Sequence, residues 1–515
     1  MSSSPYTKEN VRTGIFHYLL GRGASGVASF FSVILLVRHM SVAHYAAYTA
    51  LMGLGMLATL LSGLGLDRAI TRYVPEGRLK HASAALIRFV WLTAGVRLAA
   101  VLLVLALMLL AWSQVLHLFP AIGLDAFPIG LAFYLMAASL FQHFSTVLQA
   151  LVQQKLLTRL MMFQWGGRFA LICLFVLTQA DISVDQSILV MAVPEMLGML
   201  AMTLALHRHF VQLRAGESMP ARDGHWPPWR EVYALALHNH GYNLLAAPPQ
   251  GYFMRLFAAA LLPVQFVAAY GFFLSLGERV RQYLPLQMMF NLAEPILMAG
   301  YVQDRNFDKL AERTQLLYKL NLFFLAPAMV WLAFSAPALV NVITGGKYGE
   351  LAWILLLVVA QMAIGSHALI VQLLLNAVGE SKLLLRSGTG AMLLMCATLV
   401  AIYLHGTMSY LIFAPLVYEF SNNALALWQL GRKGHAYRIP LRFVAHVALA
   451  SAVGGIACFL GGLPGMPALL SLIVTAALCA VGFLATLWMS GAITPSEIQI
   501  MKSIFKKKSI AVETK

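Results

Sequence analysis

Long apolar stretches recur along this chain and are separated by short polar segments. A membrane-spanning helix needs ~20 predominantly apolar residues, and the hydropathy pattern predicts about fourteen such helices. The predicted spans are 14–38, 45–66, 86–111, 128–151, 160–179, 187–207, 232–260, 264–298, 316–340, 350–377, 384–404, 408–430, 441–461 and 468–489. The pattern therefore predicts an all-α polytopic membrane protein.

Composition agrees with this fold class. The 515 residues are 60% hydrophobic and 11% charged, whereas a soluble protein carries roughly 25% charged residues. The polar start, residues 1–13, is followed by a long apolar segment without a clear small-residue cleavage site, so we expect a retained first helix and no signal peptide. The cysteines all fall in apolar segments, which indicates small buried residues and neither a disulfide framework nor a metal site. No cofactor is expected. These cysteines are Cys173, Cys396, Cys458 and Cys479.

Lysine and arginine gather in every second connection between the predicted helices. The basic connections include 68–80, 155–159, 208–230, 305–313, 382–386 and 432–438. The alternate connections, such as 112–127, 180–186 and 462–467, carry almost none. Since this bias sets membrane orientation, we expect the basic side and both termini to face the cytoplasm of a bacterial inner membrane. The net charge of +16 follows from this topology, so we expect contacts with membrane lipids and no nucleic acid partner.

An internal repeat divides the chain. The segment 148–159 matches 375–386 with half of its paired positions identical, and Ser41–Tyr48 resembles 263–270 at a nearly equal offset. Each copy holds an even number of helices, so both have the same orientation, and a substrate site is expected between them. The predicted organisation is a tail at 1–13, an N-lobe at 14–207, a linker at 208–231, a C-lobe at 232–430, two further helices at 431–489 and a basic tail at 490–515.

The seventh predicted span, 232–260, contains the least regular apolar sequence in the chain. Residues 238–255 carry Pro248, Pro249, several amides and Arg255. Proline removes a backbone hydrogen bond and bends a helix. Irregular backbone within a membrane is tolerated where it is buried in protein or lines a cavity, and a charged residue there indicates a functional site. The sequence therefore predicts a kinked helix that faces a central cavity.

Several motifs resemble a known family. The end of the second span, Gly63–Glu76, resembles the cytoplasmic junction of polysaccharide transporters, the Wzx-type flippases of the multidrug/oligosaccharidyl-lipid/polysaccharide superfamily. The connector Ser41–Tyr48, the turn 345–348 and the segment 377–382 also fit. The resemblance covers roughly the first twelve helices and implies two six-helix lobes around a central cavity, alternating access and transfer of an isoprenoid-pyrophosphate-linked oligosaccharide. The extra helix pair is similar to that of the lipid II flippases, where it adjoins a groove for the lipid tail.

Six arginines lie well inside predicted spans, away from their ends, where each would cost ~2.5–3.5 kcal/mol at the bilayer centre. The arginine side chain offers a fork of donors that fits phosphate oxygens, so we expect some of these residues to bind a lipid-linked pyrophosphate. Because the resemblance implies that the first, second, seventh and eighth helices line the lobe interface, the best candidates are Arg22, Arg255, Arg279 and Arg281. Second choices are Arg97 and Arg168, which can instead pair with acids such as Glu195. Ion pairing or snorkelling is the alternative for each of them.

Polar and acidic residues within the spans supply further candidates. Sugar contacts are expected from Asn239, Tyr242, Asn243, Gln250, Tyr252, Gln287 and Asn291, with hydrogen bonding between helices as the alternative. Ion coupling is expected from Glu195, Glu278 or Glu419. Glu278 has Arg255, Arg279 and Arg281 as possible ion-pair partners. The histidines show no metal-site spacing, and no catalytic residue is expected.

The favoured function is a flippase for undecaprenyl-pyrophosphate-linked oligosaccharides that feeds O-antigen or exopolysaccharide assembly, with a polysaccharide polymerase as a possible partner. An ion-coupled exporter of small molecules from the same superfamily is the alternative, although the surplus of arginine over glutamate in the spans opposes a cationic substrate. A membrane polysaccharide polymerase or ligase is disfavoured, because the connections predicted to face outward are short and poor in histidine, arginine and acids.

Overall fold

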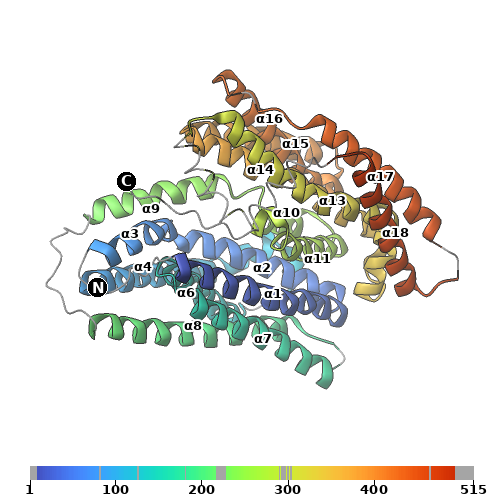
Figure 1. The fold of residues 1–515 in the computed structure, drawn as a ribbon. Coiled ribbons are helices and arrows are strands. Elements are labelled where there is room, and N and C mark those ends of the chain that lie inside the picture. The colour runs from blue at the N-terminus through green and yellow to red at the C-terminus, as the bar shows by residue number, and fades with distance from the viewer. Residues whose placement is uncertain are drawn as a thin grey trace. The chain divides into compact units, whose positions relative to one another are not determined.

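The computed structural model describes residues 8–80, 83–124, 127–179, 181–215, 228–288, 290, 297, 301, 304–435, 437–462 and 465–492, without the side chains of 8–20, 22, 79, 80 and 381. These residues form α-helices joined by loops and short 3-10 turns, and no strand occurs among them (Figure 1). Ten of the described helices are long and apolar enough to cross a membrane. They are α2 (Val42–Gly63), α4 (Ser83–Leu110), α6 (Ile129–Ala150), α7 (Gln154–Thr178), α8 (Val184–Ala215), α13 (Phe307–Thr344), α14 (Trp353–Ala377), α15 (Ser381–Leu404), α17 (Leu441–Gly461) and α18 (Ala468–Met489).

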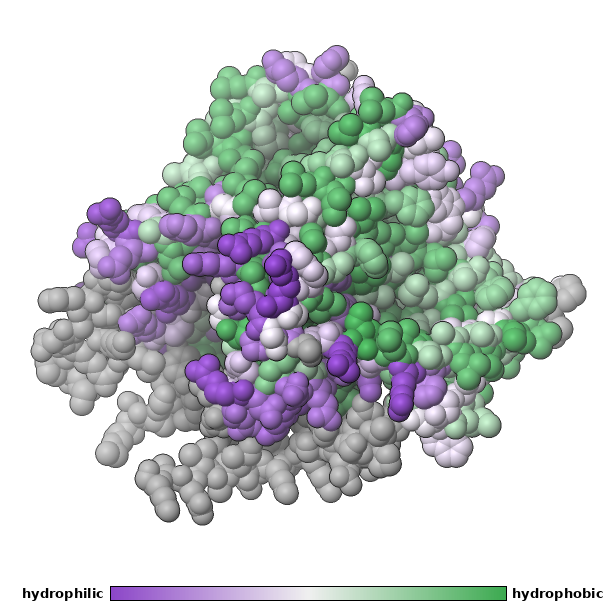
Figure 2. All heavy atoms as spheres, turned by 90° about the horizontal axis from the view of Figure 1, so that it is seen from above, coloured by the Kyte–Doolittle hydropathy of each residue, from purple (hydrophilic) through white to green (hydrophobic). Residues whose placement is uncertain are grey.

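The other helices are shorter or less apolar. They are α1 (Lys8–His39), α3 (Leu66–Lys80), α5 (Trp112–Leu118), α9 (Trp229–Leu245), α10 (Gly251–Leu261), α11 (Val264–Arg281) and α16 (Ala414–Arg432), with 3-10 turns η1 (Pro120–Ile122), η2 (Gly349–Leu351) and η3 (Met408–Phe413). Many large apolar side chains are exposed, and apolar residues cover much of the face seen in Figure 2. Such a surface is expected of helices that contact lipid, and the chain is a multi-pass membrane protein.

The seventh predicted span is not continuous. Helix α9 ends at Leu245 and α10 begins at Gly251, and Pro248 and Pro249 lie in the non-helical residues between them. Neither proline has a backbone N–H to donate, so the helix stops there and a new one begins after Gln250, whose backbone is extended. The eighth predicted span, 264–298, contains α11 only as far as Arg281, and Asn291 and Glu294 lie outside the described residues. The short polar helix α3 was not predicted.

The chain divides into two compact units: Met1–Arg279 with Leu399–Ile412, and Val280–Thr398 with Phe413–Lys515. In the first unit, α1 packs on α7, α6 on α8, and α2 on α4 and α10. Helix α2 ends in a tight turn where Gly65 has a φ of +68°. A Cβ on Gly65 would lie 1.9 Å from the carbonyl oxygen of Ala236 on α9. Glycine thus permits both the left-handed backbone and the close approach of α9.

In the second unit, α13 packs against α14, α17 and α18, and α17 packs along α18. Helix α13 begins where the side chain of Asn306 accepts a hydrogen bond from the backbone N–H of Lys309, a common N-cap arrangement. The Lys309 ammonium donates to Asp304 and lowers the pKa of that carboxyl. The buried residues between α13, α17 and α18 include Phe443 and Phe483. The lobes predicted from the repeat, 14–207 and 232–430, stay a prediction.

Candidate functional site

Arg255 lies just over one turn into α10, directly after the proline break. Its side chain is 4% exposed. One terminal nitrogen donates to Oε2 of Glu278 at 2.9 Å and to Oγ of Ser275 at 3.1 Å, both on α11, and the other lies 3.4 Å from Sδ of Met56 on α2. The break and the start of α10 therefore position a buried arginine whose charge is balanced by one carboxylate of the adjacent helix.

A second buried ion pair joins α7 to α8. The guanidinium of Arg168 donates to the carboxylate of Glu195, which also accepts a hydrogen bond from the amide of Gln164. Arg168 is 5% exposed and Glu195 is 4% exposed. A charge this deeply buried is tolerated when it is paired and hydrogen-bonded, and the α7–α8 interface provides both for Glu195.

Trp165 connects this pair to a third arginine. The guanidinium carbon of Arg168 lies 4.4 Å from the Trp165 ring centroid, and that of Arg279, on α11, lies 4.5 Å from the same centroid. Both distances are within the range of a cation–π interaction. Among the described residues, Arg279 has no ion pair or hydrogen bond, and its Nε is buried without a partner. We call Arg168, Arg255 and Arg279, with Glu195, Glu278 and Trp165, the arginine cluster.

The arginine cluster has a surplus of positive charge, because its three arginines face two glutamates. Two tyrosines, Tyr48 on α2 and Tyr134 on α6, lie within electrostatic reach of all three arginines. A cation with unused donors, held in a low-dielectric region, is suited to bind an anion. Arg279 is the member with these properties.

Arg97, a second choice for substrate binding, belongs to a separate buried network. It is fully buried and donates to Oδ1 of Asp67 on α3 and to Oγ of Ser139 on α6, each at 2.9 Å. Asp67 also accepts a hydrogen bond from Gln142 at 3.0 Å. The network fixes α3 against α4 and α6 and uses two of the three guanidinium nitrogens of Arg97, which is the ion-pairing alternative for this residue.

The remaining arginine candidates do not join the arginine cluster in the described residues. The side chain of Arg22, on α1, lies outside the described side chains. Arg281 is exposed at the last position of α11 and lies within electrostatic reach of Glu419 on α16, in the second compact unit. Glu419 itself is half-buried beside Gly365 of α14. The described residues offer Glu419 no hydrogen-bond or ion-pair partner.

The expected sugar-contacting residues are dispersed. The side-chain amide of Asn239 donates to the carbonyl of Leu235 within its own helix at 2.8 Å. The side chains of Tyr242, Asn243 and Gln250 are exposed, and those of Tyr252 and Gln287 are partly buried. Asn291 lies outside the described residues. Within the described part of the chain, none of these side chains has a hydrogen bond to the arginine cluster. That part also contains no group of three potential metal ligands among His, Cys, Asp and Glu.

Several participants in these networks were not predicted, among them Trp165, Gln164 and Asp67. Trp165 precedes Arg168 by three residues, and Gln164 precedes it by four, so all three share one face of α7. An aromatic residue at this spacing from a membrane arginine would have indicated the contact of Trp165 with Arg168. The amide of Gln164 instead reaches Glu195, the partner of Arg168 on α8. Asp67 gave no such signal, because its partner Arg97 is distant in sequence.

No protein-family model matches the sequence, and no curated protein matches it. Among solved structures, the lipid II flippase MurJ in an inward closed conformation matches over 95% of this chain and 99% of its own, with a TM-score of 0.69 and 11% identity. The MATE transporter VcmN of Vibrio cholerae matches over 83% of this chain and 98% of its own, with a TM-score of 0.52 and 17% identity. The chain therefore has the fold of these transporters, although its sequence identity to them is low.

Proposed function

We propose that this protein is a flippase that moves undecaprenyl-pyrophosphate-linked oligosaccharides across the bacterial inner membrane for O-antigen or exopolysaccharide assembly. The fold is that of a lipid II flippase and a MATE transporter, and the resemblance of Gly63–Glu76 to polysaccharide transporters favours the lipid-linked substrate. The Lys/Arg bias supports cytoplasmic termini, and the repeat supports two six-helix lobes with alternating access between them. A polysaccharide polymerase is the expected downstream partner.

The observation that carries the proposal is the arginine cluster, in which one arginine has no ion pair with any described residue. A pyrophosphate entering a low-dielectric region needs compensating charge. Arg168 and Arg255 each have a carboxylate partner, whereas Arg279 has none among the described residues. In this proposal Arg279 binds a phosphate oxygen first, and Arg255 and Arg168 bind when the anion displaces their glutamates. Arg22 and Arg281 are further proposed ligands, and the sugars contact polar residues of α9 and α10 in the hydrated part of the path.

The test is transport of a labelled lipid-linked oligosaccharide in proteoliposomes. Arg279→Gln removes the cation and keeps an amide, and Arg159→Gln is the matched control, because Arg159 is exposed on the same helix as Arg168. A lost charged hydrogen bond of about 1.5–3 kcal/mol predicts a roughly tenfold or larger loss of affinity for the substrate. Arg255→Ala and Arg22→Ala should also slow transport. Rates equal to the wild type in all three variants would remove the proposed phosphate site.

A second candidate function, an ion-coupled exporter of small molecules, is favoured by Glu419. Glu195 and Glu278 are each bonded to an arginine, whereas Glu419 has no such partner in the described residues. A partly buried carboxylate with no cation bonded to it in the described residues is suited to bind a proton or sodium ion. If Glu419→Gln abolishes proton- or sodium-driven export of a small molecule, and Arg279→Gln leaves that export intact, the exporter is favoured. The solved structures that the chain resembles are transporters, and nothing observed supports a polymerase or ligase.

A further inference from the structure

Trp165 occupies an unusual place for a tryptophan of a membrane protein. It lies near the middle of the 25 residues of α7 and is partly buried. Tryptophans of membrane helices gather at the two interfaces with water, near the helix ends, where the indole N–H finds a partner. An interfacial role therefore does not explain this residue, and its contacts with charged side chains have to be considered.

The first contact fixes the indole ring. The guanidinium carbon of Arg168 lies 4.4 Å from the ring centroid of Trp165, and this guanidinium donates to the buried carboxylate of Glu195 on α8. The same carboxylate accepts a hydrogen bond from Gln164. Because Arg168 is held by its ion pair, the ring that contacts it is held as well. A side chain supported in this way by its neighbours can position a third group.

The second contact involves Arg279 of α11, which lies in the same compact unit as α7. Its guanidinium carbon lies over the Trp165 ring, 4.5 Å from the centroid, where the negative face of the ring attracts a cation. The buried Nε of Arg279 has no hydrogen-bond partner among the described residues, so the ring holds the cation without using this donor. A carboxylate at this place would also hold the arginine, but it would occupy the donors and compete with an incoming anion.

The shared ring also brings two like charges together. The guanidinium carbons of Arg168 and Arg279 are no farther apart than the sum of their two distances from the Trp165 centroid. Like charges at this range repel each other, and more strongly where water is excluded. A bound anion would reduce this repulsion, so the arrangement favours one.

We propose that Trp165 is a positioning residue for phosphate binding, whose ring holds the guanidinium of Arg279 in place with donors available to the phosphate. This role rests on the proposed function, in which Arg279 binds the pyrophosphate of the substrate. A flexible arginine side chain loses rotamer freedom when it binds an anion. The ring restricts that freedom beforehand, so less is lost in the binding step. Trp165 acts through Arg279 and needs no contact with the substrate.

The experiment measures the affinity of the full chain in detergent for farnesyl pyrophosphate, a short isoprenyl pyrophosphate, by isothermal titration calorimetry. Trp165→Leu keeps an apolar side chain and removes the aromatic face, and the loss of a cation–π contact predicts a roughly two- to thirtyfold weaker affinity. Trp165→Phe keeps an aromatic face and should retain most of the affinity. The matched control is Trp428→Leu, because Arg432 lies 4.9 Å from the Trp428 ring centroid on α16, outside the arginine cluster.

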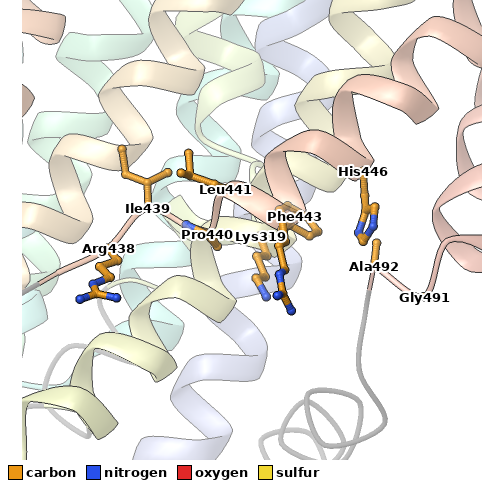
Figure 3. Close-up of a pocket in the computed structure, with 10 residues that line it drawn as sticks. Lys319, Arg438, Ile439, Pro440, Leu441, Phe443, His446, Gly491 and Ala492 are labelled. Carbon is orange, nitrogen blue, oxygen red and sulfur yellow. The ribbon is translucent and has the colours of Figure 1, made fainter.

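A double-mutant cycle separates positioning from damage to the fold. If Trp165 acts through Arg279, then Trp165→Leu weakens binding in the wild type and has no further effect in the Arg279→Gln background. The control for charge is Arg438→Gln. Arg438 is an exposed arginine that lines a cavity of about 920 Å³ in the second compact unit, near the start of α17 (Figure 3). We expect this variant to bind farnesyl pyrophosphate as the wild type does.

The positioning role is supported when Trp165→Leu loses affinity, Trp165→Phe retains it, and the loss disappears in the Arg279→Gln background. It is overturned, while the phosphate site stands, when Arg279→Gln binds weakly but Trp165→Leu binds like the wild type, or when the two losses add. Equal losses in the leucine and phenylalanine variants, or in either control, also overturn it. It fails together with the proposed function when the wild type does not bind farnesyl pyrophosphate, or when Arg279→Gln binds as tightly as the wild type.

Discussion

Removal of one member of the Arg168–Glu195 pair should destabilise the protein far more than removal of both. Arg168→Met would leave the Glu195 carboxylate, 4% exposed, with only the amide of Gln164. An uncompensated charge in a buried ion pair costs about 3–5 kcal/mol. In the double substitution, Arg168→Met with Glu195→Met, both charges are absent and apolar side chains fill the space, a change that is often neutral or stabilising.

The assay is equilibrium unfolding of purified protein in one detergent at fixed lipid content, analysed as a double-mutant cycle. We expect Arg168→Met to lower the free energy of unfolding by about 3 kcal/mol or more, and the double variant to recover most of the loss. The matched control is Lys433–Glu380, which has a 2.9 Å ion pair with side chains 51% and 32% exposed. Its disruption by Lys433→Met should cost less than ~1 kcal/mol, because water and salt screen it.

Two results would refute this reasoning. If Arg168→Met and Lys433→Met cost the same, burial does not determine the strength of these pairs. If the double variant at Arg168 and Glu195 is as unstable as the single variant, the loss comes from packing of the arginine stem rather than from the unpaired carboxylate.

Three further predictions concern single positions. Arg279→Gln should lower the free energy of unfolding by only about 0.5–2 kcal/mol, the value of a cation–π contact, while transport falls strongly; a large fall in both would indicate a structural role. Gly65→Ala should destabilise the protein far more than Gly123→Ala. Both glycines have a positive φ, but an added Cβ would lie 1.9 Å from the Ala236 carbonyl at Gly65 and would meet no atom within 4 Å at Gly123. Thermal melting compares the two variants, and equal losses of melting temperature would exclude the clash. Asn321→Ala should lower the free energy of unfolding by about 1–3 kcal/mol, since the fully buried amide donates a 2.8 Å hydrogen bond to α14. An unchanged free energy of unfolding would mean that this hydrogen bond does not stabilise the fold.

Much of the secondary structure could be predicted from the sequence, because a membrane helix must satisfy its backbone internally and therefore appears as a continuous apolar run. The predicted span 441–461 coincides with α17, and 468–489 with α18. The break at Pro248 and Pro249 was predicted as a kink, since proline lacks the N–H that a helix needs. The amphipathic α3 was missed, because its polar residues lower the mean hydropathy that marks a span.

The candidate site was predicted only in part. The sequence identified Arg168, Arg255 and Arg279 as buried or membrane-embedded cations, because a charge inside an apolar run is a local signal. It left open which glutamate would pair with which arginine. Glu278 had three possible partners, and the structure pairs it with Arg255, which leaves Arg279 stacked on Trp165.

The sequence by itself determined that this chain spans a membrane, approximately where many of its apolar helices lie, and which arginines sit within them. These properties depend on neighbouring residues and on the helical period alone. Only the tertiary structure decided which charges cancel and which remain. The stacking of Arg279 of α11 on Trp165 of α7 depends on the packing of helices distant in sequence. No local pattern encodes such contacts, because they arise when separate apolar faces are buried against one another.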